Sequence, residues 1–206
     1  MPISYKRRVV EAELRRRLAS AGAIVIEGPK ACGKTATAET LAASVVLLDV
    51  DEQARRVADI EPDLVLTGES PRLIDEWQVV PSIWNHVRRA VDKRGQPGQF
   101  ILTGSAVPAD DITRHTGAGR LSRVRMRPMS LFESGHSTGA MSVAALLDGR
   151  CAKTPDPGLT ITALAERIAV GGWPGNLGKK PADAIVAVRG YIDEIRRVDL
   201  RRIDGV

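Results

Sequence analysis

The sequence predicts an α/β fold in which five mainly parallel strands form one sheet with helices on both faces. Short apolar runs rich in β-branched residues recur along the chain, and helix-forming segments separate most of them. Strands that alternate with helices in this way form parallel sheets. A third observation is the length of 206 residues, which is enough to bury a full core without disulfides. We therefore expect one core domain, or one core with a small appendage.

The elements are expected in the following order. An arginine-rich helix over residues 6–20 comes first, because apolar residues recur there at helical spacing. Its apolar stripe consists of Val9, Val10, Leu14 and Leu18. Strands follow, since apolar β-branched runs are typical of the buried strands of a parallel sheet. The predicted strands cover residues 22–27, 44–50, 71–76, 98–105 and 121–127.

The C-terminal part of the chain lacks the strand patterns of the part before it. A helix over residues 82–95 precedes the fourth strand, but after about residue 128 the strand patterns end and helical patterns continue. We therefore predict a core over residues 1–135 and a small helical lid over residues 136–206. No membrane span or signal peptide is visible, and Cys32 and Cys151 do not make a disulfide framework. These features favour a cytoplasmic protein without a membrane partner.

The run GPKACGKT at residues 28–35 lies between the first strand and a helix-forming segment. It matches the phosphate-loop pattern G-x-x-x-x-G-K-[ST] at every fixed position. The glycines let backbone N–H groups point at phosphate oxygens, the lysine faces the β and γ phosphates, and the final hydroxyl binds Mg²⁺. The run therefore predicts a nucleotide site. Its expected contacts are Gly28, Pro29, Lys30, Ala31, Cys32, Gly33, Lys34, Thr35 and Ala36.

The run RLIDEW at residues 72–77 is a short apolar strand that ends in two adjacent carboxylates. A phosphate-loop enzyme needs an acid at the C-terminal end of a neighbouring strand to hold Mg²⁺ or its water shell, and Asp75 is placed for this role. Glu76 is then expected to orient and activate the attacking water. The alternative interpretation is a helix cap or a solvated turn after the strand.

The run FILTGS at residues 100–105 is a third buried strand, and it ends in small hydroxyl side chains. If this strand lies between the phosphate-loop strand and the acidic strand, Thr103 or Ser105 can bond the γ-phosphate or the lytic water. Such a residue would report whether the γ-phosphate is present. The alternative is a glycine turn capped by serine, which is common at strand ends.

Together these motifs resemble the AAA-type ATPase domains of bacterial and archaeal proteins that usually carry a second, C-terminal domain of unassigned function. The similarity extends from about residue 5 to the end of the chain. The residues that carry it are YKRR, IVIEGPKACGKTATA, RLIDEWQVVPSIWNHVRRAVD, GQFILTGSA, TGAGRLSRVRMRPMSLFESG and GGWP. The resemblance implies a P-loop NTPase sheet of strand order 5-1-4-3-2, ATP and Mg²⁺ as ligands, and ATP hydrolysis as the reaction.

The resemblance also implies a role for each site residue. Lys34 and Thr35 bind the nucleotide and the metal, Asp75 is the metal acid, Glu76 is the water-activating base, and the hydroxyl after the fourth strand is the sensor. Family members are longer, so the chain is expected to end before a further C-terminal domain. The biological target is not implied.

Two further roles are expected from the resemblance alone. AAA-type enzymes commonly complete the site with an arginine from a neighbouring subunit, for which Arg120 in TGAGR is the candidate. A homo-oligomer, or the further C-terminal domain, is then the expected partner. The alternative is that Arg120 only ends a glycine loop. Tyr5 and Arg8 are expected to form one wall of the adenine pocket.

Two other functional classes stay open. The net charge of +5 permits a nucleotide-gated DNA-binding or regulatory module with little hydrolysis, although no helix-turn-helix or zinc signature supports base readout. A small-molecule kinase is the other alternative, but the region 140–180 has few of the arginines expected of a phosphate-facing lid. The three tryptophans are expected to be packing anchors.

Overall fold

The computed structural model describes residues 5–104, 116–150, 153–154 and 158–199. The chain forms two compact units, Met1–Arg127 and Pro128–Val206, called unit 1 and unit 2 below. Unit 1 contains every strand among the described residues, and unit 2 is helical there.

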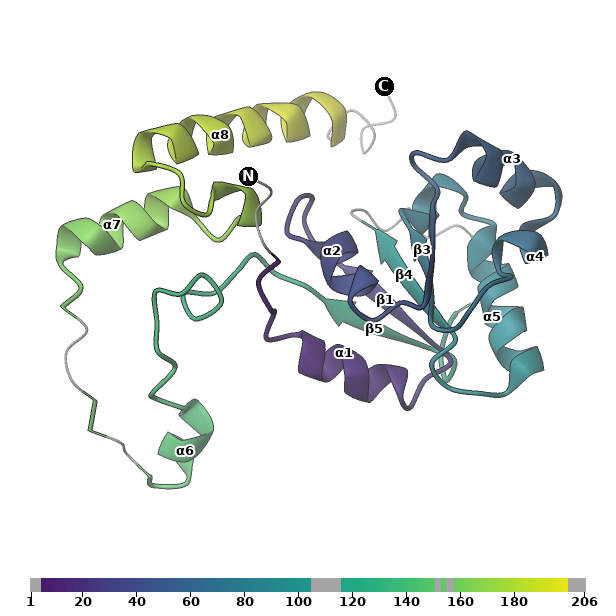
Figure 1. Ribbon diagram of the computed structural model, residues 1–206, viewed down its shortest axis with the longest axis horizontal. Coiled ribbons are helices and arrows are strands. Elements are labelled where there is room, and N and C mark those ends of the chain that lie inside the picture. Colours follow the sequence, from purple (N-terminus) through teal and green to yellow (C-terminus); the bar gives the residue numbers. More distant parts are fainter. Residues whose placement is uncertain (1–4, 105–115, 151–152, 155–157, 200–206) are drawn as a thin grey trace. The chain divides into compact units, whose positions relative to one another are not determined.

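Unit 1 is built on one five-stranded sheet (Figure 1). The strand order is β2-β3-β4-β1-β5, and every pair of neighbours is parallel. This confirms the predicted α/β class and the order 5-1-4-3-2. The strands are β1 (Ala23–Glu27), β2 (Ser44–Leu47), β3 (Arg72–Asp75), β4 (Phe100–Gly104) and β5 (Leu121–Arg125). Because all strands run the same way, their C-terminal ends meet at one edge of the sheet.

Helices connect the strands and cover both faces of the sheet (Figure 1). On one face lie α1 (Glu11–Leu18) and α2 (Lys34–Glu39). The other face is covered by α3 (Glu52–Ile60), α4 (Pro62–Val65) and α5 (Ile83–Arg94), with the short 3-10 helix η1 (Trp77–Val79) beside them.

The main core lies between the sheet and α3 to α5. Val25 and Leu102 of the central strands pack there with Val87 of α5, and all three are completely buried. Trp77 and Trp84 are each 1% exposed, and their ring centroids lie 5.1 Å apart. This arrangement confirms that these two tryptophans are packing anchors. The opposite face is covered in part by Leu14 and Leu18 of α1.

The first helix is shorter than the predicted range of residues 6–20, which was wrong at its start. Helix α1 begins at Glu11, and residues 5–8 have no regular secondary structure. The reason is tertiary: the backbone N–H of Arg8 donates to Glu11 Oε1 at 2.7 Å, and the Arg8 guanidinium reaches another segment of the chain. Val9 is 61% exposed, so the apolar stripe is carried by Leu14 and Leu18.

Unit 2 consists of short and medium helices. They are α6 (Val143–Leu147), α7 (Ile161–Val170), η2 (Pro174–Asn176), α8 (Pro181–Glu194) and a π-helical turn η3 (Ile195–Asp199). Helix α7 packs against α8, and Trp173 and Tyr191 stack with their ring centroids 4.7 Å apart. Within the described part of the chain, no helix has the length and apolar character needed to cross a membrane.

Candidate functional site

The phosphate loop joins the C-terminal end of β1 to the start of α2. Its backbone takes left-handed conformations at Ala31, with φ 58°, and at Gly33, with φ 98°. Gly28 is required by close packing, since a Cβ atom there would lie 2.3 Å from the backbone oxygen of Met126. The loop therefore turns tightly against the end of β5.

Lys34 lies within the loop. Its side chain is only 5% exposed, and its Nζ donates hydrogen bonds to the backbone oxygens of Gly28 and Pro29, each at 3.0 Å. The ammonium charge is therefore held against the loop backbone. This is the position from which a lysine can bind terminal phosphates.

Three polar side chains from different elements meet next to the loop. Thr35 Oγ1, at the start of α2, donates to Asp75 Oδ1 at 2.9 Å. Thr103 Oγ1, on β4, donates to the same carboxylate oxygen. Because β4 lies between β1 and β3, Thr103 stands between the phosphate-loop strand and the acidic strand. The structure thus joins three of the predicted site residues directly.

Asp75 is buried, with 5% of its surface exposed. Burial raises the pKa of its carboxyl above the ordinary value, and the nearby carboxylates of Glu76 and Asp49 raise it further. The hydrogen bonds from Thr103 and Thr35 lower the pKa in part, but the net shift is upward. The surroundings of Asp75 therefore disfavour the ionised form of its carboxyl.

The donor set suits a Mg²⁺ ion. A buried carboxylate beside a threonine hydroxyl offers the hard oxygen ligands that Mg²⁺ prefers, and this ion usually uses one or two carboxylates together with phosphates and waters. Among the described residues there is no group of three or more His, Cys, Asp or Glu that could hold a metal ion alone. Thr35 and Asp75 would hold the ion jointly with nucleotide phosphates.

Glu76 follows Asp75 at the point where β3 ends. Its backbone is left-handed, with φ 49° and ψ 46°, a conformation that is unfavourable for a residue with a side chain. This turn breaks the strand alternation that would otherwise point Glu76 and Asp75 to opposite faces. The Glu76 carboxylate accepts a hydrogen bond from Gln78 Nε2 of η1. Such local strain is frequent at functional sites.

Two other predicted site residues are Ser105 and Arg120. Ser105 lies outside the described residues. Arg120 immediately precedes β5 and so lies at the N-terminal ends of the strands, whereas the phosphate loop follows the C-terminal end of β1. Its Nε pairs with Asp92 Oδ1 at 2.7 Å. The Arg120 side chain is 42% exposed. In its own chain Arg120 therefore lies away from the phosphate loop.

Sequence reasoning missed how Arg8 is used. Its guanidinium donates to the backbone oxygens of Cys32 and Arg127, each at 2.7 Å, and its expected place at an adenine pocket stays a prediction. Gln78 was also missed as a partner of Glu76. The only signal for Arg8 was its place in the YKRR run, which gives no hint of these distant acceptors.

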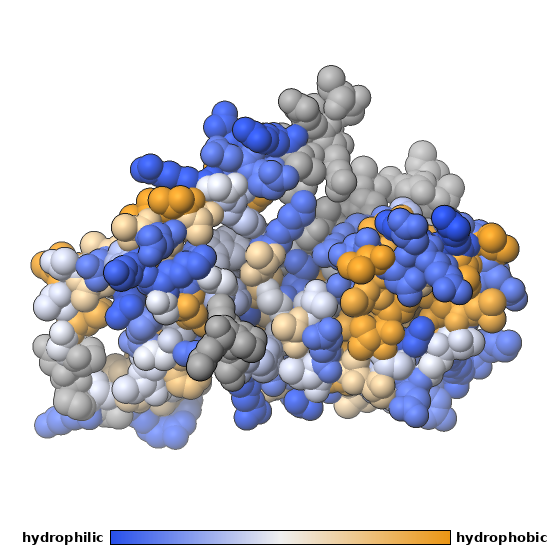
Figure 2. Space-filling view, turned by 45° about the horizontal axis from the view of Figure 1, so that its top comes forward, coloured by the Kyte–Doolittle hydropathy of each residue, from blue (hydrophilic) through white to orange (hydrophobic). Residues whose placement is uncertain are grey.

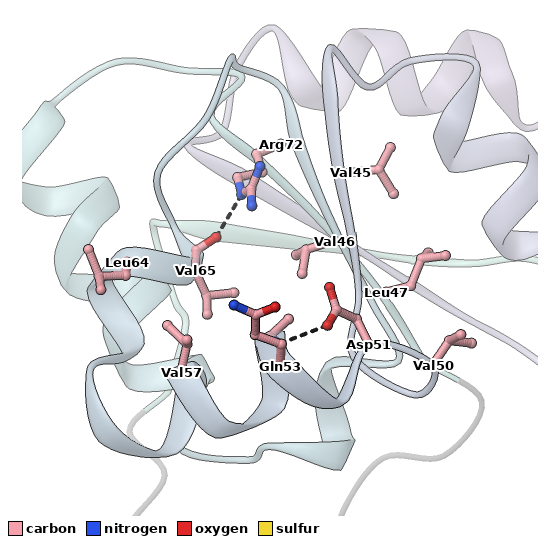
Figure 3. A pocket seen from close by; sticks show the side chains of 11 residues that line it. Val45, Val46, Leu47, Val50, Asp51, Gln53, Val57, Leu64, Val65 and Arg72 are labelled. Carbon is pink, nitrogen blue, oxygen red and sulfur yellow. Dashed lines mark hydrogen bonds between the residues drawn. The ribbon is translucent and has the colours of Figure 1, made fainter.

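A cavity lies at the β2 edge of the sheet, away from the phosphate loop. It has a volume of about 540 Å³ and lies beside β2, α3 and α4 (Figure 3). Its walls are mostly apolar, and its two charged residues are engaged: Arg72 Nε donates to the Val65 oxygen at 2.6 Å, and Asp51 caps α3. Apolar surface gathers at this end of unit 1 (Figure 2), where Val50 is 71% exposed. This cavity lacks the groups for phosphate chemistry.

Known proteins are similar to this chain over part of its length. A family model described as an AAA domain matches residues 20–134. The uncharacterized proteins Mb2031c of Mycobacterium bovis and Rv2008c of Mycobacterium tuberculosis are each 32% identical over 138 residues, which are 64% of this chain and 31% of theirs. The chain spans about a third of the length of these curated relatives. A solved structure of C. elegans PCH-2 aligns at 15% identity and a TM-score of 0.31, over 61% of this chain and 42% of that chain.

Proposed function

Because the chain belongs to the AAA domain family, we propose that unit 1 binds Mg²⁺-ATP at the phosphate loop and hydrolyses its terminal phosphoanhydride bond. The observation that carries the proposal is the hydrogen-bonded group Thr35–Asp75–Thr103 beside Lys34. It brings one carboxylate and two hydroxyl groups together at the C-terminal edge of the sheet. In this proposal the carboxylate is the metal acid, the Thr35 hydroxyl is a metal ligand and the Thr103 hydroxyl is the sensor. Mg²⁺ held by Thr35 and Asp75 would offset the negative charge of the phosphates.

Each side chain then has a defined task. Lys34 leaves its loop carbonyls and binds the β and γ phosphates, while Thr35 and Asp75 hold the metal. Glu76 accepts a proton from the water that attacks the γ-phosphorus, so that ADP departs as inorganic phosphate forms. Thr103 bonds the water or the γ-phosphate. For Glu76 to act, its carboxylate must accept a hydrogen bond from that water, in place of the one from Gln78 or beside it.

Nucleotide binding is the first part of the proposal to test. Titration calorimetry with ATP and Mg²⁺ should give an affinity for Lys34→Ala at least about tenfold weaker than for wild type, because a charge-assisted phosphate contact is lost. Lys93→Ala is the matched control, since it removes an exposed lysine from α5. Equal affinities for wild type and Lys34→Ala would contradict binding at this loop.

Hydrolysis is further proposed to gate a partner domain or an oligomer, with Arg120 as the arginine supplied to a neighbouring copy. The support is the position of Arg120 before the N-terminal end of β5, because the phosphate loop of the same chain follows the C-terminal end of the parallel neighbour β1. A mixing experiment tests this step. Arg120→Ala and Glu76→Gln should each be nearly inactive, whereas their mixture should regain activity by pairing an intact base with an intact arginine.

The result that excludes an arginine in trans is equally clear. In that case the mixture stays as inactive as its components, and wild-type activity per molecule does not rise with protein concentration. Each chain would then hydrolyse ATP without an arginine from a neighbouring copy. If wild type instead binds ATP tightly without turnover, the nucleotide-gated regulatory module would be favoured.

A further inference from the structure

Arg8 is a buried arginine that lies against the outer side of the phosphate loop. Its side chain is 5% exposed, and its two terminal nitrogens donate to different segments: Nη1 to the Cys32 oxygen and Nη2 to the Arg127 oxygen, each at 2.7 Å. Glu11 fixes the backbone beneath it, because Glu11 Oε1 accepts from the Arg8 N–H at 2.7 Å and from the Tyr5 hydroxyl at 2.8 Å. Arg8 therefore has little freedom to move.

The bond to Cys32 controls the direction of one loop peptide. In a planar trans peptide the C=O and the following N–H point in opposite directions. When the Cys32 oxygen is held toward Arg8, the N–H of Gly33 must point away from Arg8. A rotated peptide would instead present its oxygen on that side, where phosphate oxygens would be repelled.

We propose that Arg8 is a positioning residue for phosphate binding: it holds the Cys32–Gly33 peptide with its N–H directed into the phosphate loop. This inference rests on the proposed ATP function of the same loop. Arg8 acts through the peptide and does not touch the nucleotide. The φ of Gly33 is one of the two angles that orient this peptide, and glycine has access to both signs of φ. An outside donor can therefore select the orientation that the loop needs.

The second terminal nitrogen of Arg8 links the loop to the segment that follows β5. The Arg127 oxygen is its acceptor, and in the same region Met126 N donates to the Glu27 oxygen at 2.7 Å. Arg127 is also the last residue of unit 1. A planar guanidinium can serve two carbonyls at once, whereas the ammonium of lysine is a compact point charge on a flexible stem. Arg8→Lys therefore keeps the charge but removes the planar group that donates to both carbonyl oxygens.

Arg17 offers a closely matched control. It is also an arginine near the N-terminus that spans to β5, with Nη1 donating to the Arg123 oxygen at 3.1 Å and to Ser122 Oγ at 2.9 Å. Neither acceptor belongs to the phosphate loop. Arg17→Lys therefore perturbs a comparable tertiary anchor without changing the Cys32–Gly33 peptide.

The test is the affinity for Mg²⁺-ATP, measured by calorimetry for wild type, Arg8→Lys, Arg8→Ala and Arg17→Lys. We expect both Arg8 variants to bind about tenfold more weakly or worse, and Arg17→Lys to stay within about twofold of wild type. Millimolar guanidinium should restore much of the affinity of Arg8→Ala, because the free ion can occupy the vacated site. Thermal unfolding of each variant establishes that it is folded.

The outcomes separate the two proposals. If wild type does not bind ATP, the proposed function fails and this inference fails with it. If wild type binds and folded Arg8→Lys binds equally well, only the inference fails. Weaker binding by Arg8→Lys and Arg17→Lys to the same extent, with no rescue of Arg8→Ala by guanidinium, would assign Arg8 to general stability and also overturn it.

Discussion

Asp75 shows how a single residue can serve a site at a cost in stability. Its carboxyl is buried between two threonine hydroxyls, and its pKa is raised chiefly because burial disfavours the charged form. A metal ion would compensate this charge. Without one, ionised Asp75 is a destabilising feature of unit 1, as is common where function fixes a polar group.

The replacement Asp75→Asn should therefore stabilise the ligand-free protein at pH 8. A raised folded-state pKa means that the penalty is absent below the ordinary value of 3.8, grows as the pH rises toward the folded-state pKa, and is complete above it. Asparagine keeps an oxygen acceptor for the two threonines. Urea unfolding without nucleotide or Mg²⁺ should give Asp75→Asn the higher midpoint at pH 8 and a smaller advantage at pH 5. A lower midpoint at pH 8 would contradict this view of Asp75.

Gly28 is the residue at which the loop tolerates no side chain. Gly28→Ala places a methyl group 2.3 Å from a backbone oxygen of residue 126, which cannot move aside as a flexible side chain can. We expect a loss of about 1–3 kcal/mol in the free energy of unfolding. Gly175→Ala is the control, because its Cβ would meet open space. Chemical denaturation of both variants provides the comparison, and equal stability would refute the close packing of the loop.

At the scale of elements, the sequence predicted all five strands, but it misjudged where the first helix begins. The spacing of apolar residues predicts a helix that begins at residue 6, whereas residues 5–8 are not helical in the structure. Helical spacing reports which residues are compatible with a helix, and it cannot register that Arg8 has better partners in distant segments. The same limit hid the Gln78 contact with Glu76, which depends on the left-handed turn at Glu76.

The site residues were predictable to the extent that they follow strands. Lys34, Thr35, Asp75 and Thr103 all lie at or next to the C-terminal ends of β1, β3 and β4, where parallel strands deliver them to one edge. Arg8 could not be predicted in this way. Its contacts require residues 8, 32 and 127 to come together in the fold, and no local sequence pattern indicates this.

The Asp51 side chain caps the N-terminus of helix α3. The Asp51 carboxylate accepts a hydrogen bond from the backbone N–H of Ala54 at 2.9 Å, which satisfies a donor that the helix itself leaves unpaired. Asp51→Ala should lower the free energy of unfolding by about 1 kcal/mol, while Asp51→Asn should retain most of it. Urea titrations followed by circular dichroism measure both. A loss as large for asparagine as for alanine would argue against capping.

At the scale of the molecule, all proposed nucleotide contacts lie in unit 1. Mg²⁺-ATP at about one hundred times its dissociation constant should stabilise a binding unit by about 2.7 kcal/mol. Differential scanning calorimetry should therefore show a nucleotide-dependent shift in the transition of unit 1 and none in that of unit 2. Lys34→Ala should lose the shift. Equal shifts of both transitions would contradict the placement of the whole site in unit 1.

The most direct test of the account is steady-state release of phosphate from ATP by wild type and by Glu76→Gln, with ATP binding measured on the same samples. The account predicts Mg²⁺-dependent release by wild type, and loss of release in Glu76→Gln with binding retained, because the variant keeps the phosphate loop and lacks only the proton acceptor. Release by Glu76→Gln at the wild-type rate would contradict the role of Glu76 and the hydrolytic mechanism built on it.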